Sequence, residues 1–150
     1  MDNCPANTFC NYATKHLSYL FATYNNELHF AWGNGSGWQG YFNTGVSLQN
    51  QAWHHVSFTR NGEVTQAFLD GHLVFTGSGY FPTIGSGGDF YVGYRQDSAS
   101  QHWRGRIDEV RVYSEVRTES QIQNDMHTRP SAAELAGSGT LRAYYDMNEI

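Results

Sequence analysis

Between residues 53 and 77, polar and apolar side chains alternate in three short runs, each the length of a β-strand. The runs are WHHVSFTR (53–60), EVTQAFL (63–69) and HLVFTG (72–77). Asn61-Gly62 and Asp70-Gly71 separate them. These dipeptides suit type I′ turns, in which both central residues have positive φ. We therefore expect three consecutive antiparallel strands.

The same period of two predicts further strands on both sides of these runs. In NELHFAWG (26–33), Leu28, Phe30 and Trp32 share one face. Asn25-Asn26 is expected to turn the preceding run into this one as a second hairpin. The other expected strands lie in the ranges 16–24, 38–43, 89–95, 105–113 and 141–148.

One short helix is predicted near 118–126. Thr118 and Gln121 have the spacing of a capping box, and Ile122 and Met126 recur four residues apart. The segment from Pro130 to about residue 139 is expected to be a polar connection. Many short strands with one helix predict an all-β, two-sheet antiparallel sandwich.

Composition and charge narrow the class of protein. A chain of 150 residues is expected to form one domain. The net charge is 9 − 14 = −5 without a cluster of Lys and Arg, which argues against nucleic acid as a partner. No apolar run approaches the roughly 18 residues needed to span a membrane. Cys4 and Cys10 are close enough to form a disulfide, although two reduced thiols are an equal alternative.

Two pairs of neighbouring polar residues invite a catalytic or metal-binding interpretation. On a strand, Asp108 and Glu109 would point to opposite faces, so they could not flank one scissile bond at the required separation of about 5–10 Å. We therefore assign them to the scaffold. His54 and His55 would also point apart and could not bind one zinc ion, so one is expected to be buried and the other exposed.

Four motifs in succession carry a family resemblance. They are WHHVSFTRNG (53–62), FLDG (68–71), FYVG (90–93) and GRIDEVRVY (105–113), followed by the predicted helix. Over about residues 17–126, the sequence resembles the laminin-G-like and pentraxin branch of the concanavalin A-like lectin/glucanase jelly rolls. The resemblance implies a two-sheet antiparallel jelly roll, a binding function, and a secreted or cell-surface protein. Residues 141–149 resemble the strand that opens such domains, so the chain is either a fragment of a larger protein or fills that place with its last strand.

The resemblance also implies a calcium site, because oxygen-rich loops hold Ca²⁺ in pentraxins. The matching positions in this sequence are Asn25, Asn26, Gln96, Asp97 and Gln101. Arg95 stands where a carboxylate is expected, which leaves at most a single weak Ca²⁺ site, since affinity follows ligand charge. The alternative is that Asn25-Asn26 is simply a turn and that Arg95 pairs with Asp97.

Aromatic residues in Gly-rich or loop segments are candidates for stacking on sugar rings. They are Trp38, Tyr41, Tyr80 with its neighbour Phe81, and Trp103. The alternative is that these rings belong to the apolar core, as many aromatics of sandwiches do.

The sequence thus predicts a non-catalytic binding module that recognises carbohydrate, with a glycan or glycoprotein as its partner. One alternative is a protein-interaction or assembly domain that forms homo-oligomers through its sheet edges. The other is a glycan-active enzyme, although the Glu-x-Asp-x-x-Glu pattern of glucanases on this fold does not occur in the sequence.

Overall fold

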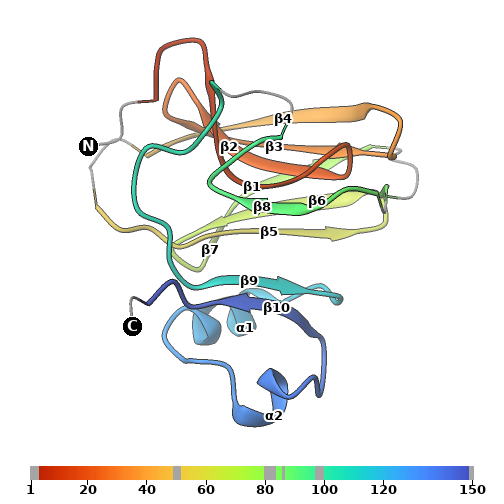
Figure 1. Cartoon of the computed structure of the whole chain (residues 1–150), viewed down its shortest axis with the longest axis vertical. Coiled ribbons are helices and arrows are strands. Elements are labelled where there is room, and N and C mark those ends of the chain that lie inside the picture. Colours follow the sequence, from red (N-terminus) through yellow and green to blue (C-terminus); the bar gives the residue numbers. More distant parts are fainter. Residues whose placement is uncertain (1–3, 49–51, 80–83, 86, 97–99, 149–150) are drawn as a thin grey trace. The chain divides into compact units, whose positions relative to one another are not determined.

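A computed structural model describes residues 4–48, 52–79, 84–85, 87–96 and 100–148. The chain divides into two compact units, each made of two stretches of sequence. The first comprises Met1–Ala52 and Gly79–Gly105, and the second comprises Trp53–Ser78 and Arg106–Ile150. All pairs between named strands are antiparallel, and the described residues contain two short helices (Figure 1). The fold is all-β and matches the antiparallel sandwich expected from the sequence.

The first unit is a five-stranded antiparallel sheet. In spatial order its strands are β4 (Trp38–Ser47), β3 (Glu27–Gly33), β2 (Tyr19–Tyr24), β1 (Phe9–Lys15) and β8 (Phe90–Val92). The predicted hairpin around Asn25-Asn26 is confirmed, because both residues have positive φ (50° and 64°) and join β2 to β3. Strand β8 is shorter than expected, since Gly93 adopts a φ of 71° directly after it.

Strand β1 was not predicted from the sequence. Its pairing with β2 shifts register between Asn11 and Ala13, so that its buried residues do not alternate regularly. A β-bulge of this kind interrupts the period of two on which strand prediction depends. A single isolated parallel bridge connects Asn11 with His102 in the segment after β8.

The two faces of the first sheet are both apolar near its centre. Leu28, Phe30 and Trp32 are at most 5% exposed, as their shared face predicts, and Phe30 stacks on Phe42 of β4. Burying each such side chain stabilises the fold by about 1.5–3 kcal/mol. The opposite face carries a cluster of Leu20, Ala22 and Ala31, against which Phe9 and Trp38 pack.

A disulfide bond closes the N-terminal segment of the first unit. Cys4 is bonded to Cys10, and the two Cα atoms are 5.8 Å apart. Cys10 is fully buried in β1, next to Phe9. Of the two alternatives that the sequence left open, the structure contains the disulfide.

The second unit contains the three-stranded meander that the turn dipeptides predict. Strands β5 (Val56–Asn61), β6 (Val64–Leu69) and β7 (His72–Ser78) are consecutive and antiparallel. The turn at Asp70-Gly71 has positive φ at both residues (50° and 80°), as type I′ requires. The other turn differs from the prediction. Asn61 pairs with Val64, so the loop consists of Gly62 and Glu63, and only Gly62 has positive φ, a pattern typical of type II′.

A second antiparallel pair joins β9 (Val110–Tyr113) to β10 (Leu141–Tyr145). The expected strand 105–113 is therefore wrong over 105–109, because Glu109 has a φ of 53° and the strand begins only after it. The pairing of the C-terminal segment within a sheet is confirmed over Leu141–Tyr145 but not over 146–148, and its partner belongs to the same chain. A register shift after Leu141 breaks the expected apolar face, leaving Tyr145 41% exposed.

The predicted helix is confirmed as α1 (Glu119–Asp125), which begins with the capping box of Thr118 and Gln121 and buries Ile122. A second helix, α2 (Ala132–Leu135), lies in the segment expected to be a connection. Ser131 and Glu134 form its capping box, so the Ser-x-x-Glu spacing was a signal available in the sequence. Neither helix is long and apolar enough to cross a membrane, within the part of the chain that the structure describes.

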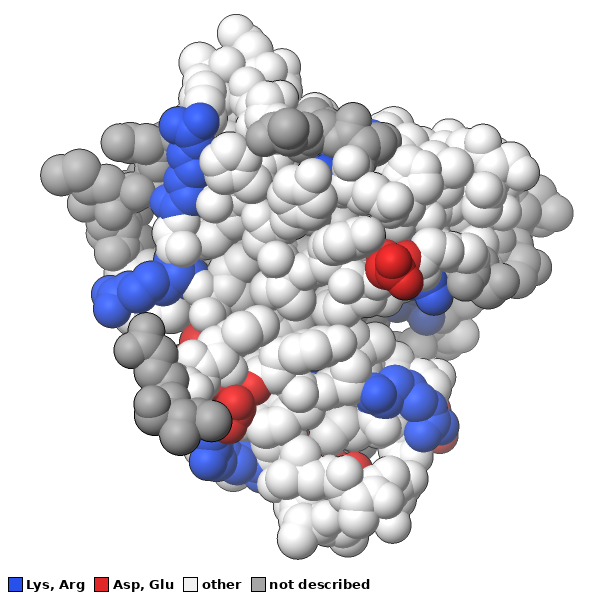
Figure 2. All heavy atoms as spheres, viewed as in Figure 1, with Lys and Arg blue, Asp and Glu red and all other residues white. Residues whose placement is uncertain are grey.

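Charged side chains are sparse on the face of the molecule shown in Figure 2. Uncharged residues predominate there, and the Lys, Arg, Asp and Glu side chains lie scattered among them. This agrees with a sequence in which charged residues make up only 15%.

Substitution of Gly71 should destabilise the protein more than the same change at Gly62. An added Cβ at Gly71 would lie 2.8 Å from Cγ of Gln123 and 3.0 Å from the sulfur of Met126, whereas nothing lies within 4 Å at Gly62. Both positions have positive φ, which costs a non-glycine residue about 1 kcal/mol. Crowding against α1 should add roughly 1 kcal/mol for Gly71→Ala. Urea unfolding of both Ala variants measures the difference, and equal losses of stability would contradict the crowding.

Candidate functional site

A hollow of about 530 Å³ opens on one face of the sheet in the first unit. Its described lining residues come from four adjacent strands and from the segment that follows β8. They are Phe9 of β1, Tyr24 of β2, His29 of β3, Tyr41 and Asn43 of β4, and Arg95 and Gln101 of that segment.

Strand register brings the sheet residues of the hollow together. Phe9 is paired with Tyr24, and His29 is paired with Asn43. Tyr41 lies two residues before Asn43 and therefore points to the same face. Phe9 and Asn43 are far apart in the sequence, and β2 and β3 lie between their strands. Both nevertheless line the same hollow.

The segment after β8 is held against this face by two buried polar side chains of β1. Asn11 is fully buried and donates a hydrogen bond from Nδ2 to the carbonyl oxygen of Gln101. Thr14 is 2% exposed, and its hydroxyl donates to the carbonyl oxygen of Tyr94 at 2.8 Å. A buried polar side chain left without a partner costs about 1–3 kcal/mol. These two bonds therefore specify where the segment lies.

Four of the seven described lining residues of the hollow carry aromatic rings. The ring centroid of Phe9 lies 4.7 Å from that of Tyr24 and 5.6 Å from that of His29. Tyr41 lies 6.4 Å from Phe9, and 54% of its surface is exposed. An exposed ring that is supported by other rings offers a flat apolar surface to a ligand.

Polar groups stand beside these rings. Arg95 donates from Nη1 to Oε1 of Gln101 at 3.0 Å, and its guanidinium carbon lies 5.5 Å from the ring centroid of Trp38. Asn43 donates from Nδ2 to Glu27 at 2.6 Å. The hollow thus combines apolar rings with a charged donor and amide groups.

Burial lowers the pKa of His29, although the nearby carboxylate of Glu27 opposes this shift. The imidazole is therefore neutral at pH 7. Arg95 is then the charged side chain among the described lining residues of the hollow.

The predicted stacking residues have different positions in the structure. Tyr41 lines the hollow, and Trp38 lies beside it with its ring centroid 6.1 Å from that of Tyr41. Trp103 instead packs on Tyr12 at 4.3 Å. Tyr80 and Phe81 lie outside the described residues.

The residues expected to bind calcium fit such an ion poorly where they are described. The side-chain oxygen of Asn25 accepts a hydrogen bond from the backbone N–H of Asn7 at 2.7 Å, and that of Gln101 accepts from Arg95. The described residues contain no group of three or more His, Cys, Asp or Glu side chains that could hold a metal ion. Asn26 belongs to the turn, Gln96 is exposed, and Asp97 lies outside the described residues. Calcium binding stays a prediction.

Sequence reasoning missed Phe9, Tyr24, His29 and Asn43 as site residues. They carry no motif and come together only through strand pairing. The sequence contained a partial signal for two of them. A two-residue turn at 25–26 pairs Tyr24 with Glu27, and this register also determines where His29 lies relative to β2.

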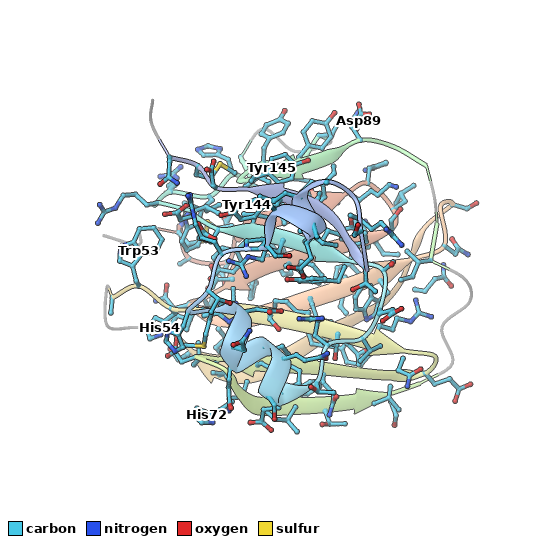
Figure 3. All side chains as sticks on the ribbon, turned by 90° about the horizontal axis from the view of Figure 1, so that it is seen from below. Trp53, His54, His72, Asp89, Tyr144 and Tyr145 are labelled. Carbon is cyan, nitrogen blue, oxygen red and sulfur yellow. A yellow bond between two sulfur atoms is a disulfide. The ribbon has the colours of Figure 1, made fainter. Side chains whose placement is uncertain are left out.

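Glu109 is bonded within the second unit, although it precedes the strand on which it was expected, since β9 begins at Val110. Its carboxylate accepts hydrogen bonds from Nη2 of Arg111 at 2.7 Å and from the hydroxyl of Tyr144 at 2.8 Å (Figure 3 labels Tyr144). Burial acts to raise the pKa of Glu109, but the hydrogen bonds from Arg111 and Tyr144 outweigh it and hold this pKa below its usual value. Asp108 accepts from the backbone N–H of Glu109 at 2.8 Å.

The two histidines before β5 also serve the second unit. His54 Nδ1 lies 2.8 Å from Oδ2 of Asp70, and the backbone N–H of His55 donates to Oδ1 of the same carboxylate at 2.9 Å. Both histidines are half-buried, so the expected division into one buried and one exposed residue is wrong. The reason is that the strand begins only at Val56.

Comparison with known proteins shows which family the sequence matches and which solved structures have a similar fold. The sequence profile described as the concanavalin A-like lectin/glucanases superfamily matches residues 6–123. No curated protein matches the sequence. A "putative carbohydrate binding protein" from Bacteroides ovatus ATCC 8483 has a similar fold, with a TM-score of 0.75 and 20% sequence identity. The similarity covers 94% of this chain and 42% of that one.

A second solved structure is an S-layer domain-containing protein (residues 221–444) from Clostridium thermocellum ATCC 27405. It shares 17% identity at a TM-score of 0.40, over 79% of this chain and 63% of that one. This chain therefore spans less than two thirds of either solved chain.

Glu109→Gln should destabilise the protein by about 1–3 kcal/mol, because the half-buried guanidinium of Arg111 would lose its charged partner. Chemical unfolding measures this loss. Glu115→Gln removes an equal charge from an exposed position and is the matched control. If the two variants are equally stable, Glu109 does not contribute to the stability of the second unit as expected.

Calcium binding can be tested by thermal unfolding. If the predicted site exists, millimolar Ca²⁺ should raise the melting temperature through the linkage RT ln(1 + [L]/Kd). Asp97→Ala should abolish the rise, whereas Asp89→Ala, at an exposed position labelled in Figure 3, should leave it unchanged. A melting temperature that responds to neither calcium nor EDTA would refute the site.

Proposed function

Because the chain belongs to the concanavalin A-like lectin/glucanases superfamily, we propose that it is a non-catalytic module that binds carbohydrate in the hollow of its first unit. The name of the Bacteroides ovatus protein supports the choice of ligand. The proposal concerns this chain alone, which spans 42% of that protein.

The observation that carries the proposal is the exposed ring of Tyr41 in a hollow that also contains hydrogen-bonding side chains. A sugar ring has an apolar face of C–H groups that can stack on an aromatic ring and hydroxyl groups that need polar partners. Ligand sites of this kind are concave and mostly apolar, with a few polar groups that orient the ligand. Tyr41 offers the flat surface, and Arg95 and Gln101 stand at the side of the hollow.

The bonding of the adjacent carboxylates Asp108 and Glu109 supports the proposal that the module is non-catalytic. Glycoside hydrolysis usually needs two carboxyl groups about 5–10 Å apart on either side of a bound sugar. Glu109 is instead engaged by Arg111 and Tyr144, and Asp108 bonds the backbone next to it.

We also propose that the protein acts outside the cell or at its surface. The disulfide between Cys4 and Cys10 supports this location, because such bonds persist in oxidising compartments. Glycans of cell surfaces and of the extracellular matrix would be accessible there.

A glycan array identifies a ligand, and calorimetry with Tyr41→Ala tests the hollow. Loss of a stacking ring should weaken binding about tenfold, which corresponds to ~1.4 kcal/mol. Tyr145→Ala removes a ring that is 41% exposed in the second unit and should leave the affinity unchanged.

Two results would count against the proposal. If no glycan on the array binds and the protein self-associates, an assembly function is favoured. If Tyr41→Ala and Tyr145→Ala change the affinity equally, the sugar does not bind in the hollow.

A further inference from the structure

We propose that the hollow selects sugars that carry a negatively charged substituent, a carboxylate or a sulfate, and that Arg95 binds this group. The proposal rests on the proposed function, since it names the class of sugar that the same hollow would bind. It assigns specificity to Arg95 and a positioning role to Gln101 and Trp38.

Arg95 is held in place before any ligand arrives. The hydrogen bond to Gln101 constrains one end of its guanidinium, and the contact with the ring of Trp38 supports its plane. Gln101 is itself anchored, because its carbonyl oxygen accepts from the fully buried Asn11. A guanidinium that is already ordered loses less entropy when it binds an anion. Its planar set of donors matches two oxygens of a carboxylate or a sulfate.

The described lining residues of the hollow bring a positive charge to it. Arg95 is the charged group among the described lining residues, and His29 is neutral at pH 7. The neighbouring carboxylate, Glu27, is not one of these lining residues and accepts a hydrogen bond from Asn43.

The net negative charge of the chain limits the attraction between an anionic sugar and Arg95 to short range. A protein with a net charge of −5 repels anions at long range, so a preference for an acidic sugar must arise at short range from Arg95. Charge-assisted hydrogen bonds are about twice as strong as neutral ones, and we expect roughly a tenfold preference for the charged sugar.

The test uses an array of sugar pairs that differ only in one substituent. One set compares uronic acids with their methyl esters, and the other compares sulfated sugars with their unsulfated forms. Calorimetry on the best pair is then repeated with Arg95→Gln, with Arg95→Lys, and with Arg104→Gln as a control that removes the same charge from an exposed position of the same unit. Thermal unfolding shows that each variant is folded.

We expect the wild-type protein to bind the charged member of a pair at least tenfold more tightly, with a preference that shrinks as salt is added. Arg95→Gln should abolish the preference, so that charged and neutral members bind equally whatever their common affinity. Arg95→Lys should retain part of the preference, and Arg104→Gln should leave it intact. A preference for uronic acids assigns a carboxylate, and one for sulfated sugars assigns a sulfate.

Equal binding of charged and neutral members would overturn the proposal and leave the carbohydrate function standing, provided that Tyr41→Ala still weakens binding. A preference that survives Arg95→Gln would also overturn it, because another residue would then bind the anion. If Arg95→Gln does not fold, the wild-type comparison still decides whether the hollow prefers a charged sugar, and Arg95→Lys tests the residue. Absence of binding to every sugar would overturn the proposed function as well.

Discussion

Two hydrogen bonds from buried side chains of β1 help to hold the segment that closes one side of the hollow. Asn11 and Thr14 are buried in the sheet, and the Nδ2 group of Asn11 and the hydroxyl of Thr14 donate to backbone carbonyls of the segment after β8. Displacing that segment would leave both side chains without these bonds, so the segment has one favourable position. Arg95 and Gln101 are placed by this constraint, although neither makes it with its own side chain.

The sequence predicted those parts of the fold that local chemistry specifies. Asn25-Asn26 and Asp70-Gly71 adopt positive φ and turn their hairpins as expected. Prediction failed where one residue breaks a regular pattern. The register shift after Asn11 concealed β1, and the positive φ of Glu109 ended the expected strand early. Neither break leaves a signal in a pattern of alternating polar and apolar residues.

The site was less predictable than the fold because it is made by residues from different strands. Tyr41 and Trp38 could be found as aromatics in a Gly-rich region, whereas Phe9 and His29 become neighbours only after β1, β2 and β3 have paired. Arg95 was recognised in the sequence, but as an obstacle to a cation. In the structure the same charge stands at the edge of an aromatic hollow, where the property that weakens a calcium site suits an anion.

The disulfide links the aromatic surface of the hollow to the redox state of its surroundings. Phe9, whose ring supports Tyr24, His29 and Tyr41, directly precedes Cys10. Cleaving the bond would detach Cys4 from Cys10, while the pairing of β1 with β2, of β2 with β3 and of β3 with β4 would remain. A reducing environment would thus remove the covalent link beside Phe9 without unpairing the strands. Protein produced in a reducing cytosol could therefore be folded by every spectroscopic measure of its strands and still lack the covalent link next to its hollow.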